Sequence, residues 1–237
     1  MSVLQSSVES LIILGSGGFA RETAAAVHAI NDRCPRFELL GFADDDNSRH
    51  GLTFEGASII GPIDEMVHLN PNAKVVVCTG SPINYTSRRR IVGRLGLDAS
   101  CYATVIHPSA SVPASAMIGV GSVLLANVVL TSECVVGDHV AVMPQVVITH
   151  DDQINSFATM AAGVKLGGSV VVGQGAYLGA GALVRENRTI GAWSLVGMGS
   201  IVTCAVPPGE VWMGAPARRY RTADIAGDLL RESELDT

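Results

Sequence analysis

The chain has 237 residues, a formal net charge of −6, 48% hydrophobic and 5% aromatic residues, and 26 glycines. The negative charge argues against nucleic acid as a partner, because phosphate binding needs a dense basic face. The five cysteines are odd in number and contain no C-x-x-C pair, so they indicate neither a disulfide framework nor a zinc knuckle, and we expect a reducing cytoplasm. The sequence predicts neither a secretory signal nor a membrane span.

The first hundred residues alternate apolar runs with helical patterns. A predicted strand at 11–14 enters a glycine turn and then a helix over 21–30. Further strands are predicted over 37–43 and 74–78, followed by an arginine-rich helix over 84–95. Such alternation indicates a parallel sheet, so we expect a small α/β, Rossmann-like domain over residues 1–104.

Two features of this domain suggest nucleotide binding. The glycine turn and Ala20 fit the fingerprint G-x-G-x-x-G/A, in which the backbone approaches a phosphate at a helix N-terminus. The strand over 37–43 ends in three aspartates, near the distance expected for a ribose or base contact. A plain tight turn and an acidic loop are the simpler alternatives. About one mononucleotide half is present, which favours a mononucleotide or nucleotide-sugar over NAD. The candidate substrate-binding residues are Gly15, Gly17, Gly18, Asp44 and Asp45.

From Ile106 to Val202 an aliphatic residue or Met stands at every sixth position, seventeen times in succession. This period is typical of a parallel β-helix, which we expect over residues 105–206 as the all-β part of the chain. With three hexapeptides per coil, residues eighteen apart should stack. We expect glycines directly after the aliphatic position, such as Gly119 and Gly167, to adopt left-handed turn conformations. Residues 207–237 should form a C-terminal loop and tail, and the ends of the β-helix need caps.

Several segments in fixed order resemble the hexapeptide-repeat sugar O- and N-acetyltransferases related to sialic acid O-acetyltransferase and UDP-N-acetylbacillosamine N-acetyltransferase. They are L-I-I-L-G-S-G-G-F-A-R-E at 11–22, G-F-A-D-D-D at 41–46, I-H-P-S-A at 106–110, T-H-D at 149–151, V-P-P at 206–208 and G-A-P-A-R at 214–218. The resemblance implies a nucleotide-sugar in the first domain, acetyl-CoA on a left-handed β-helix, and a homotrimer with active sites between neighbouring β-helices. It favours amine acceptors and a place in glycan biosynthesis; O-acetylation of a sialic acid-type sugar is the alternative.

The candidate catalytic residues are His150 and Asp151. His150 stands two residues after the buried position of Ile148, in an outward slot, and histidine has a pKa suited to general base catalysis near neutrality. The resemblance assigns this role to the histidine of the matching His-Asp pair, and Asp151 could orient the ring. A surface histidine beside an ordinary acid is the plain alternative. Gly168 stacks eighteen residues later, and we expect its N–H to stabilise the developing oxyanion of the thioester.

A column of mostly small residues, eighteen apart, could hold the pantetheine arm of coenzyme A. The resemblance places the cofactor against Gly179, Ala180 and Met198 of this region. The coenzyme A phosphates need cations. The candidates, each of which could equally be a solvated surface residue, are Lys165, Arg188, Arg218, Arg219 and Arg221.

Three positions depart from the family pattern. Thr159 and Met143 replace a histidine and an asparagine that shape the acceptor side, which puts the acceptor sugar in doubt. Asn155 replaces a glycine, and we expect it to tolerate a left-handed backbone.

Two other functions are compatible with a hexapeptide β-helix. A γ-carbonic anhydrase-type zinc lyase also uses this repeat but needs three converging histidines, and His107, His139 and His150 occupy different column positions, so no metal is expected. A noncatalytic β-helical scaffold would require neither His150 beside Gly168 nor a small-residue column. The sequence therefore predicts an acetyl-CoA-dependent N-acetyltransferase acting on a nucleotide-linked amino sugar, without a covalent enzyme intermediate.

Overall fold

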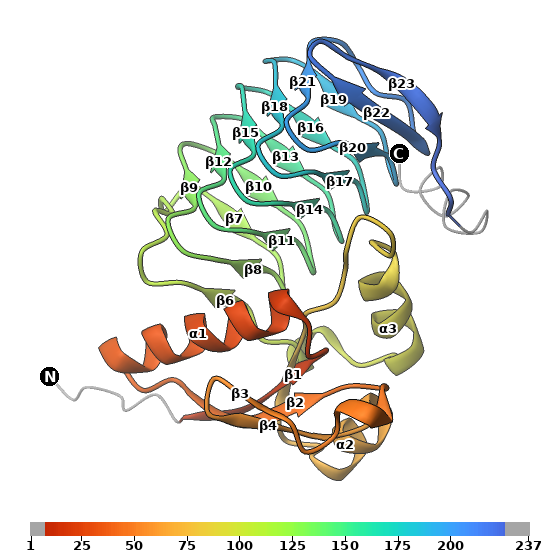
Figure 1. The fold of residues 1–237 in the computed structure, drawn as a ribbon. Coiled ribbons are helices and arrows are strands. Elements are labelled where there is room, and N and C mark those ends of the chain that lie inside the picture. The colour runs from red at the N-terminus through yellow and green to blue at the C-terminus, as the bar shows by residue number, and fades with distance from the viewer. Residues whose placement is uncertain (1–7, 226–237) are drawn as a thin grey trace, which may run out of the picture.

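The computed structural model describes residues 8–225 and consists of an N-terminal α/β sheet unit followed by a long β-helix (Figure 1). Residues 1–7 and 226–237, which belong to the predicted first domain and tail, lie outside the described residues. None of the helices within 8–225 has the length and apolar character needed to cross a membrane.

The N-terminal unit is built on a five-stranded sheet of order β3-β4-β2-β1-β5. Strands β1, β2, β4 and β5 are parallel, and β3 pairs antiparallel with β4. The core side chains of β1, Leu11 to Leu14, are fully buried. The elements are β1 Glu9–Leu14, α1 Gly18–Arg33, β2 Phe37–Ala43, η1 Asn47–Arg49, β3 Thr53–Phe54, β4 Ala57–Gly61, α2 Ile63–Leu69, β5 Lys74–Val77, α3 Ser87–Leu95 and η2 Ala99–Cys101.

The prediction for this unit was right for the alternating elements and missed the segment between them. Elements β3, β4 and α2, over residues 53–69, had no counterpart in the sequence analysis. Each is at most seven residues long, so none provides the several turns or repeated alternation on which period arguments depend.

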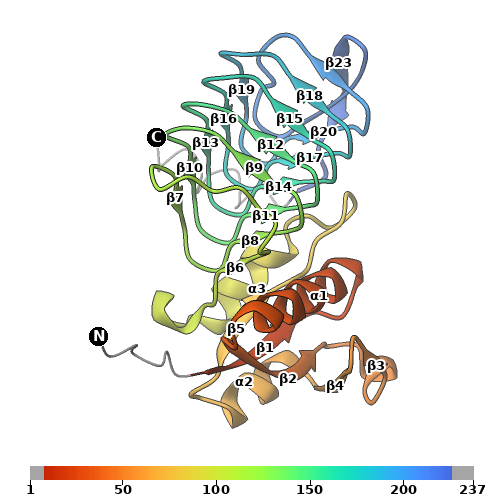
Figure 2. The ribbon, with the colours of Figure 1, turned by 90° about the vertical axis from the view of Figure 1, so that its left-hand side faces the viewer.

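The β-helix stacks two-residue strands in three columns, which Figure 2 shows as successive rungs. Strands pair in parallel with partners eighteen residues away, as Val135 does with Gln153 and Val147 with Lys165. The fold is therefore a left-handed β-helix of hexapeptide repeats, as predicted.

The columns are named here by position. The long column contains β6 Val105–Ile106, β8 Val123–Leu124, β11 Ala141–Val142, β14 Thr159–Met160, β17 Tyr177–Leu178, β20 Leu195–Val196, β22 Glu210–Gly214 and β23 Ala217–Thr222. The middle column contains β9 Val129–Leu130, β12 Val147–Ile148, β15 Lys165–Leu166, β18 Leu183–Val184 and β21 Ile201–Val202. The third column contains β7 Met117–Ile118, β10 Val135–Val136, β13 Gln153–Ile154, β16 Val171–Val172 and β19 Thr189–Ile190.

The prediction for the turn glycines was wrong. Left-handed residues stand three positions after the aliphatic residue, as at Asp151 (φ 62°) and Phe157 (φ 65°), and neither Gly119 nor Gly167 nor Asn155 is among them. Glycine directly after the aliphatic residue serves close stacking instead. A Cβ at Gly167 would stand 2.6 Å from the amide nitrogen of Glu186 in the next coil.

The two ends of the β-helix are covered differently. At the first rung, Val105, Val123 and Leu125 join a buried cluster with helix α1 residues such as Val27. At the last, β22 and β23 form an antiparallel hairpin on the long column, within the segment expected to be loop and tail. The sheet unit therefore caps one end of the prism (Figure 1).

Candidate active site

His150 and Asp151 occupy the turn that follows strand β12. The Asp151 carboxylate Oδ2 lies 2.7 Å from Nδ1 of His150, and the two side chains are 54% and 63% exposed. The hydrogen bond to Asp151 and the neighbouring carboxylates raise the pKa of His150. When Nδ1–H donates to Asp151, Nε2 keeps an available lone pair, which is the form of imidazole that accepts a proton.

Gly168 lies against the His150 ring in the next coil. A Cβ at this position would overlap Cε1 and Nε2 of His150, so the glycine leaves space for the ring in this orientation. The Gly168 carbonyl accepts a hydrogen bond from the Asn187 N–H. Within residues 8–225, its own N–H makes no hydrogen bond. The turn thus offers an unpaired backbone donor next to the imidazole.

Asp152 lies directly behind this turn and was not among the predicted site residues. Its side chain is fully buried and accepts hydrogen bonds from the N–H groups of Thr149, at 2.7 Å, and Val170, at 2.8 Å. Burial raises the pKa of Asp152 to about 6. The sequence carried a signal, because Asp152 stands four residues after Ile148, at the second inward position where small residues or Val are usual.

The residues predicted to hold coenzyme A lie at a different edge of the prism. Gly179, Ala180 and Met198 follow strands β17 and β20 of the long column, whereas His150 follows β12 of the middle column. The turns of Gly179 and Met198 touch, since a Cβ on Gly179 would stand 2.5 Å from the Met198 nitrogen. Met198 is 80% exposed. Within one chain the face of the middle column therefore separates these residues from His150.

Two of the candidate cations stand on or after strands of the middle column, and the other three stand on β23. Lys165 is exposed at the start of β15, and the Arg188 guanidinium donates to the Glu186 carbonyl beyond β18. Arg218 donates to the carbonyl of Ala217 on β23. Arg219 forms an ion pair with Glu210, and Arg221 donates to the Thr222 carbonyl. Arg218, Arg219 and Arg221 thus share one strand, whereas Lys165 and Arg188 lie on other turns of the β-helix.

A second region of interest is a cavity of about 500 Å³ in the N-terminal unit. It lies where the carboxyl ends of β1, β2 and β5 meet, the position at which parallel α/β sheets bind ligands. Its lining includes all five predicted substrate residues, Gly15, Gly17, Gly18, Asp44 and Asp45, together with Ser16, Phe19, Arg49, Ile63, Cys78, Thr79, Gly80, Ser81, Asn84, Ser87 and Ile91.

The two predicted acids in this cavity have different partners. Asp44 accepts hydrogen bonds from the Ser16 hydroxyl and the Asp46 N–H, and faces Arg49 at 3.9 Å. Asp45 is tied to the structure around α2: it accepts from the Ile63 N–H at 3.0 Å and pairs with Arg94 at 2.8 Å. Asp44 is therefore the acid held beside the glycine turn, while Asp45 fixes the start of a helix.

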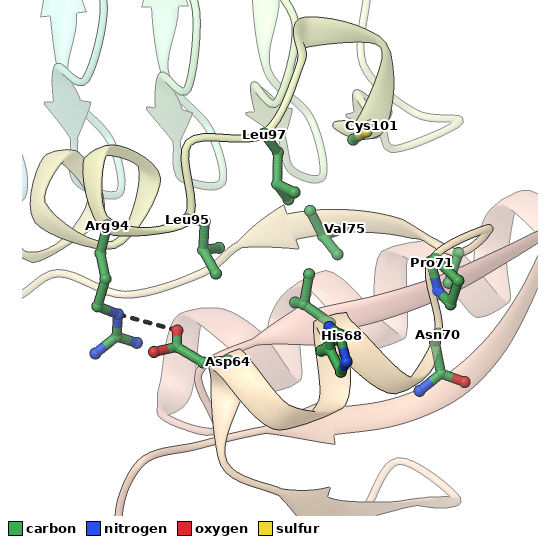
Figure 3. Close-up of a pocket in the computed structure, with 11 residues that line it drawn as sticks. Asp64, His68, Asn70, Pro71, Val75, Arg94, Leu95, Leu97 and Cys101 are labelled. Atoms are coloured by element: carbon green, nitrogen blue, oxygen red, sulfur yellow. Dashed lines mark ion pairs between the residues drawn. The ribbon is translucent and has the colours of Figure 1, made fainter.

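A further hollow of about 400 Å³ lies behind Asp45, between α2, β5 and α3. Figure 3 shows Arg94 pointing toward Asp64, with His68 and Val75 among the other side chains that line the hollow. Arg94 Nε lies 3.1 Å from Asp64, and the same guanidinium pairs with Asp45. Arg94 thus ties this hollow to the first cavity.

Arg88 joins the N-terminal unit to the β-helix. Its guanidinium is almost fully buried and donates to the carbonyls of Thr79, His139, Phe157 and Ala158 and to the Thr159 hydroxyl. Burial lowers the pKa of Arg88 to about 10, which leaves it charged at neutral pH.

Two of the three departures from the family pattern, Thr159 and Met143, lie at this junction. Thr159 receives its hydrogen bond from Arg88 at 2.6 Å, and Met143 packs against the cluster formed by the sheet unit and α1.

The three histidines considered for zinc lie in different surroundings. His139 is buried, stacked on Phe157 and edge-on to Tyr102, and burial lowers its pKa to about 4. His107 accepts from the Ser109 N–H. Among residues 8–225, no group of His, Cys, Asp and Glu side chains has the arrangement of a metal site.

Both the sheet unit and the β-helix are similar to parts of known proteins. Residues 10–95 match the family described as the PglD N-terminal domain. The chain is 33% identical over 124 residues to UDP-N-acetylbacillosamine N-acetyltransferase of Bacillus subtilis (strain 168), covering 50% of this chain and 52%, about half, of that protein. It is 29% identical over 217 residues to GDP-perosamine N-acetyltransferase of Escherichia coli O157:H7, covering 88% of this chain and 95% of that protein.

Among solved structures, the acetyltransferase domain of PglB from Neisseria gonorrhoeae FA1090, in complex with acetyl coenzyme A, superposes with a TM-score of 0.78. It is 26% identical, and the match covers 90% of this chain and all of that one. Fold and similarity together define an acyltransferase of the left-handed β-helix class. More narrowly, the chain is similar over most of its length to N-acetyltransferases that act on nucleotide-linked amino sugars.

Proposed function

We propose that this chain transfers the acetyl group of acetyl-CoA to the amino nitrogen of a nucleotide-linked amino sugar, with His150 as general base. The observation that carries the proposal is the His150 ring, hydrogen-bonded to Asp151 through Nδ1 and lying against a glycine whose N–H is unpaired. The names of both N-acetyltransferase relatives support the acceptor class.

The chemistry needs one proton acceptor and one oxyanion donor. The amine nitrogen attacks the thioester carbonyl, and Nε2 of His150 accepts the proton that the nitrogen loses. The Gly168 N–H donates to the carbonyl oxygen as negative charge develops on it. The carbon–sulfur bond then breaks, and the leaving thiolate takes the proton from His150. No acetyl group is attached to the protein at any stage.

The nucleotide of the acceptor belongs in the 500 Å³ cavity of the sheet unit. Glycines 15, 17 and 18 allow phosphate oxygens to approach the start of α1, where backbone N–H groups favour negative charge. Asp44, held by Ser16, is positioned for a hydroxyl or base N–H of the nucleoside. All five residues predicted to bind the substrate line this cavity.

We further propose a homotrimer in which one protomer supplies His150 and a neighbour supplies Gly179, Ala180 and Met198. The separation of the two groups by the middle column within one chain supports this arrangement. The exposed Met198 and the small Ala180 would leave the backbone open to a pantetheine arm. Light scattering tests the assembly: a trimer mass is expected, and a monomer mass in the active enzyme would contradict a site shared between protomers.

The activity is tested by thiol release from acetyl-CoA with UDP-, GDP- and dTDP-linked 4-amino sugars, and with sialic acid as the control for O-acetylation. Turnover with an amino sugar is expected. Turnover with sialic acid alone would favour O-acetylation, and no binding of acetyl-CoA would favour a scaffold.

A further inference from the structure

Asp152 is a carboxylate in a position that the repeat normally fills with an apolar or small side chain. Eighteen residues before it stands Cys134 and eighteen after it Val170, both buried. A charge with no exposure costs free energy unless hydrogen bonds compensate it. The sequence therefore keeps a costly group immediately next to the His150 turn.

The hydrogen bonds of Asp152 connect the turns that carry His150 and Gly168. Oδ2 accepts from the N–H of Thr149, the residue before His150, at 2.7 Å. Oδ1 accepts from the N–H of Val170, two residues after Gly168, at 2.8 Å. The carboxylate is thus a single bridge between the base and the candidate oxyanion donor, and it uses one oxygen for each turn.

A turn at another edge of the prism shows what ordinary anchoring requires. Ser122 stands at the same register position, four residues after Ile118, and is also fully buried. Its hydroxyl accepts from the Val140 N–H, eighteen residues ahead, at 2.9 Å and donates to the Gly137 carbonyl. A neutral hydroxyl is therefore sufficient to tie two coils together. The carboxylate at 152 adds a second acceptor and a negative charge.

We propose that Asp152 is a positioning residue that fixes the distance between His150 and Gly168 and whose negative charge strengthens His150 as a base. The proposal rests on the proposed function of His150. Burial raises the pKa of Asp152 to about 6, which is still below neutral pH, so the carboxylate remains mostly ionised there.

Other ionisable groups stand in the His150 turn and in the coils stacked before and after it. Asp151 lies in the same turn, Glu133 and the Cys134 thiol stand in the preceding coil, and Glu186 stands in the coil after Gly168. Cys134 donates to the Thr149 carbonyl at 3.0 Å and so holds the same turn from the other side.

The test compares D152S and D152N with S122A as the matched control. D152S keeps a hydroxyl anchor like that of Ser122 and should fold even if D152N does not. We expect kcat to fall by about tenfold to a hundredfold in both variants, the range for misplacement of a catalytic group. The KM for acetyl-CoA should be nearly unchanged, and the acid limb of kcat/KM should move to lower pH. S122A should leave kcat and the acid limb unchanged.

A second readout needs no activity. In an NMR titration of the full-length protein in its native oligomeric state, the pKa of the His150 imidazole should be lower in D152S than in wild type. Wild-type kcat and an unshifted imidazole in D152S would overturn the proposal, and so would an equal loss of kcat in S122A. If wild type transfers no acetyl group while the imidazole pKa still falls in D152S, the proposed function fails but the link from Asp152 to His150 stands.

Discussion

The β-helix and the N-terminal unit use different means to hold a site. In the β-helix, each coil repeats the one before it, so a turn differs from its neighbours only where a side chain breaks the pattern. His150, Asp152 and Gly168 are such places. In the N-terminal unit no element repeats another, and the cavity is formed by three strand ends that are distant in sequence. In a repetitive fold, functional residues can be recognised in the sequence as departures from the repeat. In a fold without repeats there is no such pattern, so functional residues are recognised only from their contacts in the structure.

The largest effect is expected from H150A, which tests the proposed catalytic site on the β-helix. We expect turnover to fall by about 10² to 10⁴-fold, because a lost general base costs this much. The affinity for coenzyme A should change little, since the predicted cofactor residues lie at another edge of the prism. Steady-state kinetics and a binding titration measure the two quantities. Near-normal turnover would remove His150 from the mechanism.

The junction between the two regions is tested by R88M. The change removes a guanidinium that satisfies four carbonyls and a hydroxyl in the interior. Each buried acceptor left without a donor costs about 1–3 kcal/mol, with strong non-additivity, so we expect a loss of about 3 kcal/mol in the free energy of unfolding. Urea denaturation measures it.

R90M is the matched control for this change, because Arg90 is exposed on the same helix. It should alter the free energy of unfolding by less than about 0.5 kcal/mol. Equal effects of the two substitutions would mean that Arg88 does not tie the regions together.

The N-terminal side of the comparison is tested by D44N. The variant keeps the size of the side chain but loses its charge beside Ser16 and Arg49. We expect nucleotide-sugar binding to weaken by about tenfold, the value of one charge-assisted hydrogen bond. Calorimetric titration should show acetyl-CoA binding intact. Unchanged nucleotide-sugar affinity would reject the assignment of the cavity.

The smallest effect is expected from D151N. This variant tests how far Asp151 raises the basicity of the His150 imidazole, as distinct from orienting its ring. Asp151 raises the pKa of His150, so its removal lowers that pKa. The neutral imidazole is the active base, and the acid limb of kcat/KM should therefore move to lower pH. A pH–rate profile against wild type measures the shift. A limb displaced to higher pH would contradict the assignment of His150 as the group that titrates.

The period of six was enough to predict the β-helix, because every coil repeats the same pattern of buried aliphatic residues. The same regularity predicted the stacking of Gly168 on His150, which the structure shows. It did not predict the role of Asp152, because spacing gives the register of a side chain but not its hydrogen-bond partners. The left-handed position was misassigned because glycine serves both turn geometry and close stacking, and sequence alone does not distinguish these.

The sheet unit was predictable only in outline. The glycine turn and the acids at 44–45 were visible as motifs, and the structure places them around one cavity. Arg88 was read only as part of a basic helix, because its five acceptors come from residues 79 to 159 and no local pattern connects them. Long-range contacts of this kind depend on how the two regions pack.

The most direct test of the account is to identify where the acetyl group goes. Wild-type enzyme is incubated with labelled acetyl-CoA and the nucleotide-linked 4-amino sugar that gives the fastest thiol release, and product and protein are analysed separately by mass spectrometry and NMR. The account predicts an acetyl group on the amino nitrogen of the sugar and no label on the protein. An acetyl group on a hydroxyl oxygen, or an acetylated enzyme that passes its label to the sugar, would contradict it.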